Sequence, residues 1–136
     1  MRDHHIKIGF LIAAAFNILG MGIFTHGLTN RVLFETDPEM FSVPGCVLVM
    51  TWGLAYAAQS RTWLVAPGVT AVFAVEKLIF AGWWVRWMIL HAGELGAIRQ
   101  RSALAGAFYG AYGLGDAAFM VFFAWAARRA WVRATP

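Results

Sequence analysis

Four long apolar stretches alternate with short polar connections along the chain. The stretches cover roughly residues 6–28, 44–63, 69–91 and 103–127. A helix needs roughly 20 mainly apolar residues to cross the hydrocarbon core of a bilayer, so each stretch is long enough to span a membrane. The pattern predicts an all-α fold: one domain, residues 1–136, built as a four-helix transmembrane bundle.

The first polar connection, residues 29–42, carries helix signals of its own. The run Thr36-Asp37-Pro38-Glu39 offers a capping oxygen, a proline suited to a first turn, and an acidic group near the positive end of the helix dipole. We therefore expect a short helix at the membrane surface. Ser42-Val43-Pro44 repeats the signal where the second stretch begins.

Composition agrees with a lipid environment. The chain of 136 residues is 60% hydrophobic and 13% charged, with a mean hydropathy of +0.62. Soluble domains are about 45–50% apolar and about a quarter charged. The net charge of +4 would suit nucleic acid, but the arginines flank apolar stretches instead of forming a stripe on a polar domain. The lipid bilayer is therefore the expected partner, and nucleic acid is not.

The distribution of basic residues predicts the orientation, because lysine and arginine concentrate in cytoplasmic connections. With both termini inside, the inner side holds Arg2, Lys7, Arg61, Arg128, Arg129 and Arg133, and the outer connections hold Arg31, Arg99 and Arg101. We expect a multi-pass protein of the bacterial cytoplasmic (inner) membrane with both termini in the cytoplasm. The first stretch has a basic start like a secretory signal, but its apolar run exceeds the usual core of about 7–15 residues. It is therefore predicted to be a retained span.

Polar residues inside the apolar stretches mark the candidate site. An ionised side chain at the bilayer centre costs about 2.5–3.5 kcal/mol on insertion scales, so such groups face the bundle interior and find partners. At helical spacing, aromatic and amide side chains fall on faces that can turn inward with them. The predicted polar layer comprises Asn17, Trp52, Tyr56, Gln59, Glu76, Lys77, Tyr109, Tyr112 and Asp116.

This layer has three interpretations. It is a buried ionic network that only fixes helix register, a small cavity that binds a ligand or moves protons, or a contact with another membrane protein. The chain has no phosphate-binding loop, nucleophile elbow, zinc-protease motif or haem-attachment motif. No cofactor is expected, and the balance leans away from an enzyme.

Two further patterns are weaker. Gly106-x-x-x-Gly110 has the spacing that lets helices approach closely, which suits a second copy, another membrane protein, or packing within the bundle. His26, His91 and Glu94 fall near the same predicted membrane surface and could together hold a divalent metal. Interfacial histidines without metal are the simpler interpretation.

Four segments carry a resemblance. They are TNRVLFETDPEMFSVPGCVLVMTWGLAYA (29–57), FNILG (16–20), AVEKL (74–78) and GLGDAAFMVFFAW (113–125). Together they resemble the BphX-like family of small bacterial integral membrane proteins, which are associated with biphenyl- and aromatic-degradation operons. The resemblance covers nearly the whole chain and implies a cytoplasmic-membrane location and a link to aromatic-compound catabolism. The family has no established activity, so it supplies no catalytic residue.

The expected function is that of an accessory protein or of a protein that binds a small apolar or aromatic ligand. The alternative is a small membrane enzyme or proton-coupled transporter that uses Glu76, Lys77 and Asp116.

Overall fold

The structure is a computed structural model that describes residues 3–135, and within that range it is built of helices alone. Four are long: α1 (Asp3–Phe24), α4 (Val43–Gln59), α5 (Pro67–His91) and α7 (Ala103–Ala134). The short ones are α2 (Arg31–Thr36), α3 (Pro38–Phe41), the 3-10 turn η1 (Ala92–Glu94) and α6 (Leu95–Arg101). The predicted all-α class is confirmed.

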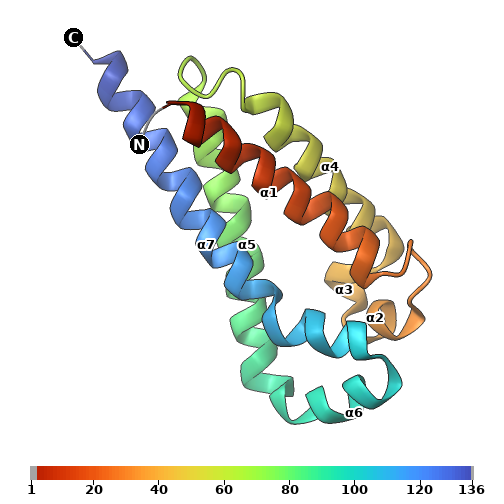
Figure 1. Cartoon of the computed structure of the whole chain (residues 1–136). Helices are drawn as coiled ribbons and strands as arrows, with labels where there is room; N and C mark the ends of the chain where they lie inside the picture. Colours follow the sequence, from red (N-terminus) through yellow and green to blue (C-terminus); the bar gives the residue numbers. More distant parts are fainter. Residues whose placement is uncertain (1–2, 136) are drawn as a thin grey trace.

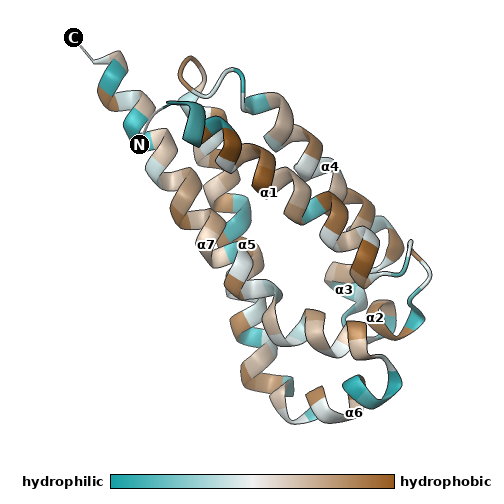
Figure 2. Ribbon diagram, in the orientation of Figure 1, coloured by the Kyte–Doolittle hydropathy of each residue, from teal (hydrophilic) through white to brown (hydrophobic). Residues whose placement is uncertain are grey.

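Three helices are long and apolar enough to cross a membrane: α1, α5 with its continuation to Arg101, and α7. The fourth long helix, α4, is apolar but has only 17 residues. Leucine, isoleucine and valine side chains stay exposed on all four long helices. Figure 2 shows brown, hydrophobic segments along each of these helices. Apolar outer faces of this kind suit contact with lipid, and the chain is a helical membrane protein.

The long helices pack as two pairs that meet side by side. α1 lies along α4, α5 lies along α7, and α1 also contacts α7 (Figure 1). The two termini lie at one end, where Arg133 Nη1 is 2.7 Å from Asp3 Oδ1. The short helices α2, α3 and α6 lie at the opposite end (Figure 1).

Three helix ends differ from the predicted stretches. α1 ends at Phe24 instead of 28, because His26, Gly27 and Leu28 all adopt positive φ angles, which an α-helix does not allow. α4 ends at Gln59 instead of 63, and residues 60–65 form turns. α7 continues to Ala134 instead of 127, since the arginines that mark a membrane boundary do not stop a helix.

The polar connections are more helical than the sequence indicated. The predicted surface helix is present as α3, which begins at Pro38, but the Asp37 side chain does not cap it. α2 precedes it and is capped by Asn30 Oδ1, which accepts from the Leu33 N–H at 3.3 Å. The polar connection between the third and fourth stretches also contains a helix, α6.

The interior holds two apolar clusters separated along the bundle. The first lies towards α2, α3 and α6 and is made of Met21, Leu33, Phe41, Cys46, Val49, Trp87, Ile98, Ala105, Phe108, Tyr109 and Tyr112. The second lies towards the termini and is made of Ile6, Phe10, Ala13, Ala14, Tyr56, Trp63, Phe73, Phe123, Ala126 and Ala130. Asn17, Glu76, Lys77 and Asp116 fall between the two clusters along their helices and are buried. A polar layer thus separates two apolar ones.

Candidate functional site

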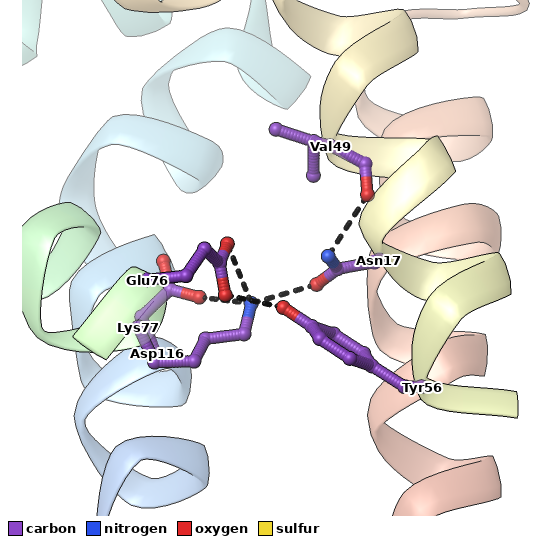
Figure 3. Close-up of polar contacts among 6 residues, drawn as sticks. All are labelled: Asn17, Val49, Tyr56, Glu76, Lys77 and Asp116. Atoms are coloured by element: carbon purple, nitrogen blue, oxygen red, sulfur yellow. Dashed lines mark hydrogen bonds and ion pairs between the residues drawn. The ribbon is translucent and has the colours of Figure 1, made fainter. Parts of the chain in front are cut away.

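The Lys77 ammonium is the centre of the polar layer. Its Nζ donates to Asp116 Oδ1 at 2.7 Å and to Asn17 Oδ1 at 2.8 Å (Figure 3). The Asn17 amide in turn donates to the Val49 carbonyl at 2.9 Å. One chain of contacts therefore joins α5 to α7, α1 and α4, and Lys77 and Asp116 form a buried ion pair.

A second contact starts from the neighbouring residue. Tyr56 of α4 donates its hydroxyl hydrogen bond to Glu76 Oε2 (Figure 3). The other oxygen, Glu76 Oε1, is 3.9 Å from Lys77 Nζ and has no hydrogen-bond partner among the described residues. Two buried carboxylates thus share a single ammonium group, and one carboxylate oxygen is left unsatisfied.

Helix geometry explains why consecutive side chains on α5 can both be buried. Adjacent residues of an α-helix point about 100° apart, so they reach two different neighbours. Lys77 points towards α7 and α1, whereas Glu76 points towards Tyr56 of α4. The Glu76-Lys77 pair therefore connects α5 to three neighbouring helices, and neither charge faces the lipid.

A cavity of about 190 Å³ lies against this polar layer. Its walls are mostly aromatic and aliphatic, and its polar side is formed by the charged residues and an amide. It is lined by Phe16, Asn17, Gly20, Met21, Phe24, Phe41, Val49, Glu76, Lys77, Phe80, Ala107, Phe108, Ala111, Tyr112 and Asp116. The site combines an apolar chamber with a few convergent polar atoms, the usual make-up of a small-molecule pocket.

The cavity opens sideways between α1 and α7. Among its lining residues, Phe16 is 41% exposed, and Ala107 and Ala111 are also exposed. A side chain added at Gly20 would meet no atom within 4 Å, so this part of the α1 wall is open. Because the mouth lies on the apolar outer surface of the helices, a molecule dissolved in the bilayer could enter directly.

Besides Tyr56, which joins the network through Glu76, three residues of the predicted layer lie outside the cavity. Trp52 packs edge-on against Phe73, with ring centres 6.0 Å apart. Gln59 Nε2 donates to the Ala66 carbonyl at 2.8 Å and so holds the turn between α4 and α5. Tyr109 donates to the Leu33 carbonyl at 2.7 Å and fastens α7 to α2. These three side chains are buried or partly buried, and they hold neighbouring elements together without lining the cavity.

Tyr112 does line the cavity, and its buried hydroxyl has no partner among the described residues. Sequence reasoning expected aromatic side chains on the inward faces, but it did not single out Phe41 or Phe108 as walls of the cavity. Phe41 and Phe80 come from α3 and α5 and meet with ring centres 6.1 Å apart. Phe108 stacks on Tyr112 at 4.9 Å. No motif distinguishes these residues from the other phenylalanines, which recur in the first, third and fourth apolar stretches.

The weaker predictions have clear outcomes. Among residues 3–135, no group of three or more His, Cys, Asp and Glu side chains is placed to hold a metal ion, so the three-ligand site of His26, His91 and Glu94 is wrong. His91 Nδ1 instead lies 2.9 Å from Glu94 Oε1 at the surface.

A Cβ at Gly106 would lie 2.8 Å from Arg99 Cα, so this glycine lets α6 of the same chain approach α7 closely. Gly110 faces open space.

The geometry therefore assembles Asn17, Tyr56, Glu76, Lys77 and Asp116 into one network beside a cavity that Tyr112 also lines. Comparison of the chain with protein-family models, with curated proteins and with solved structures gives no match.

Proposed function

We propose that the chain is a four-span protein of the bacterial cytoplasmic membrane that binds a small, mainly apolar molecule arriving from the bilayer. The observation that carries this proposal is the cavity of about 190 Å³, which is walled by aromatic side chains and open towards the lipid-facing surface. Binding without chemistry fits an accessory protein. The resemblance to the BphX-like family adds aromatic-compound catabolism as the setting.

Several features support four spans with cytoplasmic termini. α4 lies along α1 over its length, and its 17 residues fall at the lower end of the range of about 17–25 for spanning helices. An even number of spans brings both termini to one side, in agreement with the Arg133–Asp3 contact. The basic residues of α7's last turns and Arg61 belong to that same end, as expected for a cytoplasmic face.

The size of the cavity supports a small ligand. An enclosed apolar cavity of about 150 Å³ accepts one benzene molecule. The present cavity is somewhat larger, so it suits one ring with a small substituent. Dispersion contacts with the surrounding rings would supply much of the binding free energy.

Titration calorimetry of the detergent-purified protein with two single-ring probes, toluene and phenol, tests this function. Gly20→Leu adds a side chain at the cavity wall, where a Cβ meets no atom within 4 Å, so it should abolish saturable binding of either probe. Gly82→Leu is the matched control, because Gly82 also faces open space but lies outside the cavity. The proposal fails if neither probe saturates the wild type, or if Gly20→Leu binds as the wild type does.

A second candidate function, a proton-coupled transporter or small membrane enzyme, is favoured by one observation. Glu76 Oε1 is buried, unsatisfied and 3.9 Å from Lys77, the arrangement of a group that exchanges a proton. In vesicles loaded with a pH dye, phenol-dependent proton flux that is lost in Glu76→Gln would favour this function. Glu39→Gln, at an exposed position of α3, is the control.

A further inference from the structure

Two buried polar atoms at the cavity lack partners among the described residues. They are the Glu76 Oε1 atom and the Tyr112 hydroxyl, and their residues are 7% and 6% exposed. Native interiors pair nearly all such atoms, and an unpaired one points to a water, an ion or a ligand group. Both atoms belong to side chains that line the same cavity.

The chemistry of the polar side defines what that occupant must offer. Glu76 Oε1 accepts hydrogen bonds, and the Lys77 ammonium 3.9 Å away donates them. The Tyr112 hydroxyl can do either. A hydroxyl group is complementary to this mixture, because it donates one hydrogen bond and accepts others in a single small substituent.

The rest of the cavity defines the body of the occupant. Faces and edges of Phe16, Phe24, Phe41, Phe80 and Phe108 form its walls. A cavity of about 150 Å³ holds a benzene ring, and one water molecule takes a share of about 30 Å³ in the liquid. The cavity of about 190 Å³ therefore has room for one ring and one hydroxyl-sized substituent.

From these features we infer that the cavity selects a neutral single-ring aromatic molecule bearing a hydroxyl group, a phenol, whose hydroxyl pairs with Glu76 Oε1 and Tyr112. This inference rests on the proposed binding function and specifies its ligand class. The ring enters between α1 and α7 from the bilayer, and the hydroxyl end meets the polar layer.

A cationic ligand fits less well, although aromatic walls and a carboxylate would otherwise suit one. Lys77 already carries a positive charge on the polar side, within 3.9 Å of the free Glu76 oxygen. An ammonium ligand placed on that oxygen would face a like charge at close range in a low-dielectric site. A neutral donor avoids this repulsion.

The test compares phenol with toluene, which has the same shape but no hydroxyl group. Affinities are measured by calorimetry in detergent and corrected for partition into protein-free micelles. Phenol is expected to bind at least about tenfold more tightly, since a hydrogen bond to a charged group supports a difference of that size. Tyr112→Phe and Glu76→Gln should each reduce this preference by lowering phenol affinity more than toluene affinity.

Tyr109→Phe is the matched control, because Tyr109 lies one turn away on α7 but does not line the cavity, and it should keep the full preference. If toluene and phenol bind equally and both are lost in Gly20→Leu, the inference is wrong and the binding function stands. If neither binds, both are wrong. If benzylammonium binds more tightly than phenol, the ligand is cationic and the inference is overturned.

Discussion

Lys77 Nζ lies 2.7 Å from Asp116 Oδ1, with both side chains less than a tenth exposed and an apolar cluster on either side. The two residues come from α5 and α7, the most extensively packed pair of helices. In such surroundings each charge is compensated mainly by the other. The pair therefore behaves as one unit, and its members cannot be exchanged singly.

Removing one member should harm the protein more than removing both. Lys77→Met and Asp116→Leu each leave a buried charge without its partner and are expected to cost about 3–5 kcal/mol of unfolding free energy. The double variant replaces the pair with apolar side chains and should recover part of that loss, because it still removes the ammonium group beside the buried Glu76 carboxylate. Denaturation of the purified protein in mixed micelles, followed by circular dichroism, measures all three.

The exposed pair Arg101–Glu35, 3.1 Å apart, supplies the control for charge removal in general. Arg101→Met should change stability by no more than about 1 kcal/mol, since exposed ion pairs contribute little. Single variants at Lys77 and Asp116 that are as stable as the wild type would show that the buried pair is not needed for folding.

Reporter fusions should reveal an even number of spans. A fusion after Arg61 or at the end of α7 is expected to read cytoplasmic, whereas one after Glu39 or Glu94 should read outside, because α4 is expected to cross the membrane despite its 17 residues. The measurement pairs a periplasm-active with a cytoplasm-active enzyme at each site. A fusion at the end of α7 that reads outside would contradict the four-span topology.

The sequence predicts much of this architecture because burial in lipid leaves few choices. Apolar length alone locates the long helices, and the cost of a charge in hydrocarbon predicts that Asn17, Lys77 and Asp116 turn inward together. The cost of an unpaired charge also predicts that Lys77 meets a carboxylate, but it does not choose between Glu76 and Asp116. These inferences depend on solvation, which is a property of the residue types themselves.

The predictions failed at positions where backbone geometry or tertiary contacts determine a helix end or a hydrogen-bond partner. Leu28 extends an apolar run, yet its positive φ places it beyond the end of α1. Asp37 looks like a helix cap, but its carboxylate accepts from Trp83 Nε1 at 2.8 Å, 46 residues away. Tyr109 and Tyr112 are three residues apart on one helix, and only the packing against α2 gives Tyr109 a partner.

These two tyrosines should respond oppositely to the same change. Tyr109→Phe leaves the Leu33 carbonyl of the short helix α2 without its donor and is expected to cost about 1–3 kcal/mol. Tyr112→Phe removes a hydroxyl that has no partner among residues 3–135, so stability should be unchanged or slightly higher. Equal losses in thermal unfolding would mean that the Tyr112 hydroxyl is paired in the folded protein.

The glycines of α7 offer a final test, because the same substitution meets three different surroundings. An alanine Cβ at Gly106 would lie 2.8 Å from the Arg99 backbone, and at Gly113 it would overlap the Trp84 ring. Both variants should lose about 1–3 kcal/mol of stability through overpacking. At Gly110 nothing lies within 4 Å, so Gly110→Ala should gain up to about 1 kcal/mol from helix propensity.

The Gly110 result also decides what the small-residue spacing is for. If the spacing serves only to admit α6 and Trp84 of the same chain, Gly110→Ala leaves the molecular mass in detergent unchanged while stability rises. If Gly110 instead contacts a second copy, the added methyl group holds the two backbones apart, and the variant should dissociate at lower protein concentration. Light scattering of the wild type and Gly110→Ala over a dilution series separates the two outcomes.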